Sequence, residues 1–582
     1  MFCDTMMRMK RLTVYLKAYK KEALIAPFFK LLEALMDLIV PLVIADIIDQ
    51  GITASGHDIL IRDFIFLIVL AVAGMGFSFV AQYFAAKASI GFASDLRQSL
   101  FDHISTFSYR QLDRLGTGTL ITRLTSDINQ MQTGVNLALR LLLRSPFIVF
   151  GAMIMAFTID VKLALIFAIA IPLLCLAVFT IMLKSIPLFE KAQMALDKLL
   201  SNLREDLGGV RVIRAFLKEK DEIASFDADS DALTRINVLV GRLSALMNPI
   251  TYILINLATV ILISRSALRV EAGLLKQGDV VALYNYMAQI IVELIKMASL
   301  IITINKSLAC ANRVSDVLVI QNEMVYGEND LETEKTETAV SFHDVSFSYD
   351  ETSEDALEDI SFTALKGQHI GIIGATGSGK SSIVNLIPRF YDVRKGSVEV
   401  FGHDVKEYSK EQLISLIGVV PQKAILFEGN IRDNLKLGNE DADDEELCEA
   451  LKIAQGYDFV MKKDGGLNAH IEQGGRNLSG GQRQRLTIAR ALVKKPSILI
   501  LDDSASALDF ATDLKLRQGL AALKDMTVFI VSQRSSSVRH CDTILVVDDG
   551  KLVGSGNHEQ LMKDCAVYNE IYYSQFPKEQ AS

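Results

Sequence analysis

Six long apolar runs before residue 321 constrain the fold of this chain more than any other feature of its sequence. Each run is about 20 residues long, which is the length of helix needed to cross the hydrocarbon core of a bilayer. The fourth run carries no charged residue between Leu163 and Leu183. The alternative, six buried helices of a large soluble protein, fits such a run poorly. We therefore expect membrane-spanning helices at residues 24–47, 64–84, 139–157, 163–183, 246–266 and 280–304.

The links between these runs alternate in length and predict two helical arms outside the membrane. The links at residues 85–138 and 184–245 are long, polar and rich in Arg and Asp, whereas the other links are short. Two antiparallel arms of ~25 residues would reach on the order of 40 Å from the bilayer, at 1.5 Å per residue. Six spans put both arms and both termini on one side. Basic residues 10–21 mark that side as the cytoplasm.

A chain of 582 residues is too long for one hydrophobic core, so several domains are expected. The residue pattern changes twice, from long apolar runs to an acidic polar stretch and then to short Val- and Ile-rich strands alternating with helices. This predicts a transmembrane domain at 1–320, an acidic polar linker at 321–338 and an α/β domain at 339–582. The net charge of −9 argues against a nucleic-acid partner. The six cysteines are scattered without a CxxC pair, which argues against a disulfide framework or a zinc site.

Two motifs of the α/β region predict a site for a nucleotide and Mg²⁺. The strand "HIGIIG" runs into "GATGSGKSS", which fits the phosphate-binding pattern GxxxxGK[ST]. Glycines allow backbone N–H groups to face a phosphate at a helix N-terminus, while a lysine supplies charge and a serine hydroxyl reaches Mg²⁺. A second apolar strand, "SILILDD", ends in Asp502, a carboxylate suited to the magnesium shell. The residues expected at the phosphates are Gly374, Ala375, Thr376, Gly377, Ser378, Gly379, Lys380, Ser381 and Ser382.

A third motif, "LSGGQRQR", precedes Asp502 by about 20 residues, and a "SALD" segment follows it. In this order the motifs resemble the ATP-binding cassette (ABC) superfamily. The resemblance implies cassettes that dimerise head to tail, with each ATP between one chain's phosphate loop and the other chain's LSGGQ. It also implies that Tyr349 stacks on adenine, that Gln422 contacts Mg²⁺ and the attacking water, and that Asp509 belongs to the D-loop. The signature residues acting on the partner's ATP would be Leu478, Ser479, Gly480, Gly481 and Gln482.

The membrane half is similar to that of an ABC exporter half-transporter of the type IV fold. The resemblance implies a multidomain chain, in which an all-α six-helix transmembrane domain with long cytoplasmic extensions precedes an α/β P-loop (RecA-like) cassette. The loop tips near residues 109–116 and 212–216 are then candidates for the coupling helices that seat on the cassettes. It also implies a multi-pass protein of a bacterial plasma membrane, with its cassette in the cytoplasm.

Two positions depart from the family pattern. Asp503 stands where the family usually has glutamate, and Gln533 stands where it has the switch histidine. A carboxylate one methylene shorter lies on the order of 1 Å from its place, which can cost about 10²-fold in rate, and glutamine cannot carry a proton as imidazole does. An intact LSGGQ beside this damaged site predicts an unlike partner, as in the degenerate-site subunit of bacterial heterodimeric multidrug exporters. The alternative is a slow homodimer.

Charged residues inside the spans give the only indication of what is carried, because charges in a membrane are costly and often functional. An acidic, aromatic cavity would suit amphipathic organic cations. The alternative is that Glu293 and Lys296 merely neutralise each other. The rival substrates are lipids, for a flippase, and peptides. Rivals outside the exporters are a gated channel, which would need a long regulatory insertion, and a soluble cassette ATPase, which would lack spans. The cavity candidates are Glu33, Asp37, Tyr284, Gln289 and Glu293.

Overall fold

The computed structural model describes residues 12–52, 57–328, 330–332, 336–350 and 354–576. Its contacts divide the chain into two compact units. The first comprises Met1–Ser105 and Gly118–Ile320, and the second comprises Thr106–Thr117 and Gln321–Ser582. The chain therefore leaves the helical first unit for one short segment, which packs with the second unit, before it returns.

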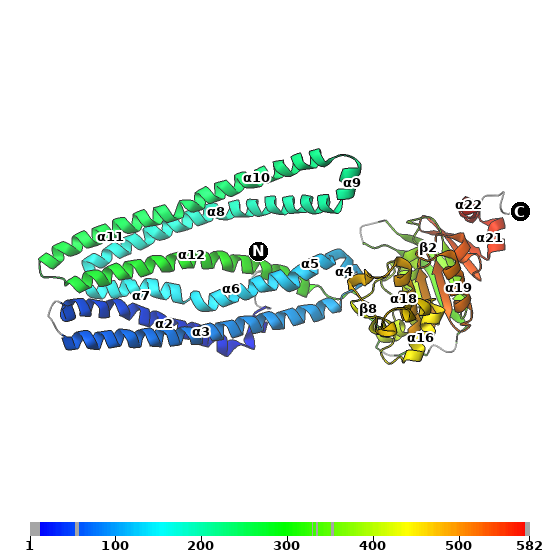
Figure 1. Ribbon diagram of the computed structural model, residues 1–582, viewed down its shortest axis with the longest axis horizontal. Helices are drawn as coiled ribbons and strands as arrows, with labels where there is room; N and C mark the ends of the chain where they lie inside the picture. The colour runs from blue at the N-terminus through cyan, green and yellow to red at the C-terminus, as the bar shows by residue number, and fades with distance from the viewer. Residues whose placement is uncertain (1–11, 53–56, 329, 333–335, 351–353, 577–582) are drawn as a thin grey trace. The chain divides into compact units, whose positions relative to one another are not determined.

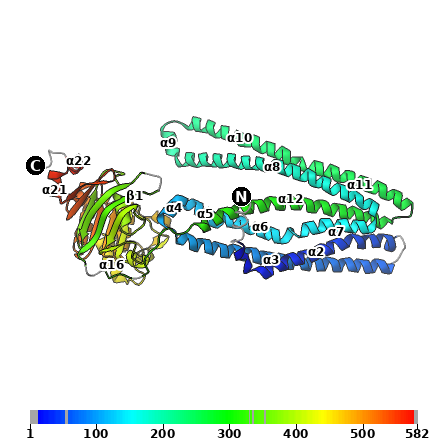
Figure 2. The same ribbon diagram turned by 180° about the vertical axis from the view of Figure 1, so that it is seen from behind.

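Over its described residues, the first unit consists of helices joined by short turns, and every predicted run except 139–157 lies almost wholly in one helix. The helices lie alongside one another in both ribbon views (Figures 1 and 2). Short helices and π-helical turns occupy α5 (Thr117–Thr122), η1 (Ile47–Ile52) and η2 (Arg123–Asp127). The long helices are α2 (Lys20–Asp46), α3 (His57–Ser105), α6 (Ile128–Leu141), α7 (Arg144–Ile159), α8 (Val161–Gly208), α10 (Glu219–Ala245), α11 (Met247–Glu271) and α12 (Gln277–Val319).

Among the described residues, five helical stretches are long and apolar enough to cross a membrane by length and composition, and most residues of their apolar segments are not buried inside the protein. Large side chains such as Phe79, Ile169 and Ile253 are exposed, which is the pattern expected where lipid replaces water. The first predicted span, in α2, is not among the five. It is helical as expected, but Lys30, Glu33 and Asp37 lie in its middle.

The third predicted span is not one continuous helix, contrary to the sequence-based expectation. A turn at Leu142 and Leu143 separates α6 from α7. Pro146 follows within the first turn of α7. Proline has no N–H to give and clashes with the preceding turn inside a helix, but it is tolerated in a first turn. The proline therefore favours a new helix start here, which places Arg144 at a helix N-terminus inside the apolar region.

The two long polar links form arms, as predicted. The C-terminal half of α8 packs against α10, and Figures 1 and 2 show the two helices side by side, joined by the short helix α9 (Val210–Ala215). Asp229 of α10 accepts hydrogen bonds from Lys198 Nζ and Asn202 Nδ2 of α8, both at 2.7 Å. None of the six residues of α9 is buried.

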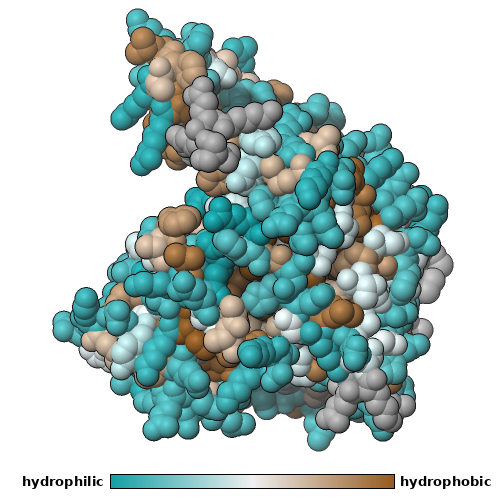
Figure 3. All heavy atoms as spheres, turned by 90° about the vertical axis from the view of Figure 1, so that its right-hand side faces the viewer, coloured by the Kyte–Doolittle hydropathy of each residue, from teal (hydrophilic) through white to brown (hydrophobic). Residues whose placement is uncertain are grey.

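The second unit is an α/β domain built on a six-stranded sheet in the order β12-β11-β3-β10-β9-β6. Its inner strands are short, rich in Val and Ile and buried, which is typical of a parallel sheet covered on both faces. The face of this domain seen in Figure 3 is mostly hydrophilic. The strands are β6 (Ile417–Val420), β9 (Ile498–Asp502), β10 (Thr527–Val531), β3 (His369–Ile373), β11 (Thr543–Asp548) and the antiparallel β12 (Lys551–Gly556).

A second, antiparallel sheet has the order β2-β1-β4-β5 and shares an apolar core with the six-stranded sheet. Helices α13 (Lys380–Leu386), α18 (Gly480–Val493) and α19 (Phe510–Ala521) each begin at a predicted motif. Because β3, β9 and β10 are parallel neighbours, their carboxyl ends meet at one edge of the sheet. The strands are β1 (Thr338–Phe347), β2 (Leu357–Leu365), β4 (Lys395–Val400) and β5 (His403–Asp404).

Candidate functional site

The predicted phosphate loop connects β3 to α13, and its glycines are required by geometry. A Cβ atom on Gly374 would lie 2.0 Å from the carbonyl oxygen of Val547. Gly377 and Gly379 have φ angles of 83° and 98°, which side-chain-bearing residues rarely adopt. The loop therefore folds tightly against the sheet, and Gly379 is the N-cap of α13. A loop that ends at a helix N-terminus is suited to bind phosphate.

Lys380 points back into this loop. Its ammonium donates hydrogen bonds to the carbonyl oxygens of Gly374 and Ala375, at 3.1 and 2.6 Å, and lies 3.3 Å from Ser378 Oγ. The side chain is buried, and this burial lowers the pKa of Lys380. The lysine charge is thus already held where the phosphate oxygens of a nucleotide would approach the loop.

Ser381 of α13 and Asp502 of β9, both assigned to Mg²⁺ by their sequence motifs, lie in contact. Ser381 Oγ donates to Asp502 Oδ1 at 2.9 Å. Burial raises the pKa of Asp502, and the hydrogen bond from Ser381 opposes that rise. A hydroxyl and a carboxylate at the mouth of a phosphate loop are oxygen ligands of the kind Mg²⁺ prefers. The two residues therefore fit the ion, which would neutralise the half-buried carboxylate and the phosphate charge.

The two positions that depart from the family pattern lie at the same sheet edge. Gln422 Nε2 donates to Asp503 Oδ2 at 3.2 Å, and Thr376 Oγ1 donates to Gln533 Oε1 at 3.5 Å. Asp503 directly follows β9, whereas Gln533 lies two residues beyond the end of β10. The structure thus brings the Q-loop glutamine, both departing residues and the phosphate loop into one place. The aspartate carboxylate is already hydrogen-bonded to a neighbouring amide.

Tyr349 lies beside the phosphate loop, as expected for a base-stacking residue. Its hydroxyl is hydrogen-bonded to Ser382 Oγ at 2.8 Å, and its ring remains partly exposed. Tyr391 packs edge-on against it, with the ring centroids 5.2 Å apart. Sequence reasoning missed Tyr391. A "FYD" segment after the phosphate-loop helix gave no motif that could have identified it.

The signature and the D-loop aspartate each begin a helix. Ser479 is the N-cap of α18 and forms a reciprocal capping box with Gln482. A Cβ on Gly481 would lie 3.1 Å from the carbonyl oxygen of Ala507, so this part of the helix packs closely on the D-loop. Asp509 caps α19, and its hydrogen bonds from Thr512 lower its pKa. The N-terminus of α18 carries the positive end of a helix dipole and is therefore suited to an anion.

Sequence reasoning also missed Gln575, a residue of the C-terminal helix α22 (Ala566–Gln575). Its Oε1 accepts hydrogen bonds from the backbone N–H and the hydroxyl of Ser535, at 2.8 and 2.9 Å. Its Nε2 donates to the carbonyl oxygen of Gln533 at 2.8 Å. The last helix therefore holds the backbone of the Gln533 segment. No local pattern signals such a contact, because about 40 residues separate the partners.

The first predicted loop tip is a docked helix, α4 (Tyr109–Leu115), in the second unit. Its Ser108 and Gln111 form a capping box. The ring of Tyr109 lies 4.4 Å from that of Phe390, and Tyr391 donates its hydroxyl to Asp113 Oδ2 at 2.7 Å. Since α4 lies in the chain between α3 and α5, the contact ties the α/β domain to the helical unit through the chain itself.

In the helical unit, the predicted acidic residues join a network centred on Arg144, which sequence reasoning missed. Arg144 donates from Nη1 to Glu293 at 2.6 Å and from Nη2 to Asp37 at 2.9 Å. Glu293 also pairs with Lys296 at 2.9 Å, as the neutralisation alternative expected. Glu33 pairs with Lys30 at 2.5 Å. Each carboxylate thus has a cationic partner, and the network contains three charges of each sign.

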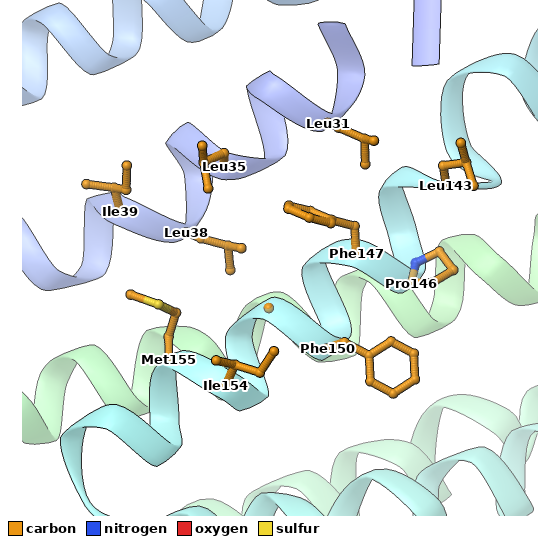
Figure 4. Close-up of a pocket in the computed structure, with 11 residues that line it drawn as sticks. Leu31, Leu35, Leu38, Ile39, Leu143, Pro146, Phe147, Phe150, Ile154 and Met155 are labelled. Atoms are coloured by element: carbon orange, nitrogen blue, oxygen red, sulfur yellow. The ribbon is translucent and has the colours of Figure 1, made fainter. Parts of the chain in front are cut away.

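Two pockets lie on different sides of α2. The first is a cavity of about 370 Å³ next to the network, between α2, α7 and α12, and Asp37, Gln289 and Glu293 are among its lining residues. Tyr284 is half-exposed on α12 and is not part of this lining. The second pocket, of about 600 Å³, is apolar and lies between α2 and α7, where Phe147 points toward α2 (Figure 4).

Comparisons with known proteins agree over almost the whole chain. Residues 23–294 match the model of the ABC transporter transmembrane region, and residues 357–506 match that of the ABC transporter. An uncharacterized ABC transporter ATP-binding protein of Mycobacterium tuberculosis is 36% identical over 96% of this chain and 97% of its own length. YgaD of Bacillus subtilis, named for multidrug export, is 31% identical over 97% and 98%. The solved structure of a bacterial Atm1-family ABC exporter with ATP bound has a TM-score of 0.80 and 24% identity, over 96% of this chain and 99% of that chain.

Proposed function

Since this chain belongs to the ABC transporter family, with a helical transmembrane domain followed by an ATP-binding cassette, we propose that it is the degenerate-site subunit of a heterodimeric exporter. The exporter moves amphipathic small molecules out of the cytoplasm or the inner leaflet. One observation carries this proposal. Asp503 and Gln533 replace the usual catalytic residues at an otherwise complete nucleotide site, while the signature at Ser479 is intact.

The roles of the two ATP sites follow from which residues face each nucleotide. In this chain's own site, Lys380 and Ser381 bind the phosphates and Mg²⁺, but Asp503 is short and its carboxylate engages Gln422. This site retains nucleotide and hydrolyses it slowly. The signature of this chain completes the partner's site, where the partner supplies glutamate and histidine. Hydrolysis there resets the transporter, and the likeness to YgaD, whose name refers to multidrug export, supports an amphipathic substrate.

A partner subunit would also explain why apolar side chains are exposed at and after α9. This helix and the residues that follow it expose the apolar side chains of Val212, Phe216 and Leu217, next to the two arginines of α9. Exposed apolar residues at the tip of an otherwise polar arm are typical of a docking surface. We assign them to the cassette of the second half-transporter, by analogy with the way α4 seats on the cassette of this chain.

Affinity purification of the tagged chain from its native membrane tests the heterodimer. We expect a second half-transporter in equal amount, with glutamate and histidine at the two positions that correspond to Asp503 and Gln533. A stable homodimer with full ATPase and export activity would contradict the proposal. Re-expressing the chain with and without its partner separates an obligate pair from one that merely copurifies.

Restoring the glutamate alone should not restore fast ATP hydrolysis at this chain's own nucleotide site. Asp503→Glu in the heterodimer is expected to change the kcat of ATP hydrolysis by no more than about twofold, because Gln533 still cannot accept and return a proton. The measurement is single-turnover hydrolysis, which counts fast sites per complex. Asp503→Asn is the matched control and should behave like the wild type. Two fast sites after the single change to glutamate would refute our assignment of the slow site.

The contact between α4 and the α/β domain should control how strongly substrate stimulates ATP hydrolysis, rather than how tightly ATP binds. Tyr109→Ala removes an aromatic contact with Phe390, and such pairs contribute about 0.5–1.5 kcal/mol beyond area burial. We expect substrate-stimulated ATP hydrolysis to fall by about 3- to 10-fold, while the affinity for ATP stays unchanged. Tyr109→Phe keeps the ring and is expected to keep the stimulation. Equal losses in both variants would show that the ring contact is not what couples the domains.

A further inference from the structure

We propose that the 370 Å³ pocket between α2, α7 and α12 binds zwitterionic ligands, which carry one ammonium group and one carboxylate or phosphate, in preference to organic cations. The proposal rests on the exporter function and names its substrate class. It replaces the acidic cavity expected from the sequence with a site of balanced charge.

The exposure of the charged side chains singles out one group of each sign. Glu293 is 4% exposed and Arg144 is 11% exposed, so both charges are held inside the network. By contrast, the Asp37 side chain is 44% exposed and the Lys296 side chain is 43% exposed. Both line the same pocket. A ligand in this pocket therefore meets one available carboxylate and one available ammonium group.

Gln289 supplies an unused acceptor beside Asp37. Its Nε2 donates to the backbone oxygen of Asp37 at 3.1 Å, which fixes the orientation of the amide. Its Oε1 is buried and has no hydrogen-bond partner in the described part of the chain. An unsatisfied buried acceptor is costly, and a ligand ammonium group that reached this oxygen from the pocket would satisfy it. The anionic end of the ligand would then face Lys296.

The balance of the network disfavours a ligand with a single charge. The three pairs of opposite charge already cancel. A cation or an anion alone would leave a net charge in a region of low dielectric constant, whereas a zwitterion adds none. Apart from Asn285, the remaining lining is apolar and includes Val40, Ile44, Ile148 and Val292. The pocket is therefore suited to a zwitterion with a short hydrocarbon chain.

A matched set of fluorescent probes tests this preference on the complete transporter in lipid nanodiscs. The probes are Nε-dansyl-lysine, which is a zwitterion, dansylcadaverine, which is a cation, and 6-(dansylamino)hexanoic acid, which is an anion. We expect the zwitterion to bind at least about tenfold more tightly than either other probe, as one charge-assisted hydrogen bond predicts. Stimulation of ATP hydrolysis should follow the same order.

Two variants should then change selectivity in opposite directions, which a merely structural role would not produce. Asp37→Asn removes the ammonium partner, so the zwitterion loses about tenfold in affinity while the anion does not. Lys296→Gln removes the anion partner, so the zwitterion loses affinity while the cation does not. Lys306→Gln is the control, because Lys306 is an exposed lysine of α12 outside the pocket. It should leave all three affinities unchanged.

The outcomes separate this inference from the exporter function. If the complex pumps a hydrophobic dye with ATP but binds the three probes equally, the zwitterion site is refuted and the exporter stands. If the cation binds best and only Asp37→Asn weakens it, the acidic cavity expected from the sequence is right instead. If no probe or dye is moved with ATP, the exporter function itself fails.

Discussion

Replacing Ser479 with arginine should abolish most ATP hydrolysis by the complex, with a loss of at least about 100-fold in kcat, as expected when donors to a transition-state anion are removed. Ser479 caps α18 at the signature, and a long cationic side chain would block the anion site offered to the partner's ATP. Lys380→Met, in this chain's own phosphate loop, should lower the kcat of ATP hydrolysis by less than about tenfold, because that site contributes little hydrolysis. Steady-state ATPase assays of the purified complex measure both losses.

Arginine at an N-cap also weakens a helix by about 1 kcal/mol, so a control for folding is needed. Ser415→Arg places the same side chain on an exposed position of the same domain and should leave activity unchanged. Photolabelling with an azido-ATP analogue should still label this chain in the Ser479→Arg complex and lose that label in Lys380→Met. Equal losses of hydrolysis from the two variants would mean two equivalent sites, which is the behaviour of a homodimer.

Arg144→Leu is expected to destabilise the helical unit by about 3–5 kcal/mol, the cost of breaking a buried ion pair by removing one partner. Arg144 bonds Glu293 and Asp37, and Glu293 is almost completely buried. In this variant Glu293 keeps its hydrogen bonds with Lys296 and Ser145, but these do not replace the lost bond to Arg144. The measurement is thermal or denaturant unfolding of the detergent-solubilised complex. Arg265→Leu removes an exposed arginine of α11 and should have little effect.

A double variant distinguishes lost charge balance from lost packing. Arg144→Leu combined with Glu293→Gln leaves no unpaired buried carboxylate at residue 293, so it should recover a large part of the stability lost in the single variant. If the double variant is less stable than Arg144→Leu alone, the network does not act through charge pairing. If Arg144→Leu is as stable as wild type, Arg144 is not the centre of the network.

The sequence predicted the local features of this protein well, because each depends on neighbouring residues. The apolar runs became helices, since a run of apolar residues long enough to span a bilayer must satisfy its own backbone hydrogen bonds. The tight turn of the predicted phosphate loop depends on its glycine positions, as the close approach at Gly374 and the positive φ at Gly379 show. The strand-ending Asp502 and its partner Ser381 could be paired because parallel strands end at one edge.

The tertiary structure alone decided which distant side chains meet. Arg144 lies more than a hundred residues from Asp37 and from Glu293, and its role depends on a helix break beside Pro146 that brings its guanidinium between two other helices. Tyr391 and Gln575 likewise act through partners that no sequence period connects. The sequence determined that the chain spans a membrane and binds a nucleotide, because length, hydropathy and local backbone geometry are properties of short segments. Packing between segments determined that the membrane charges are balanced rather than acidic, because a pair energy depends on distance through space and not along the chain.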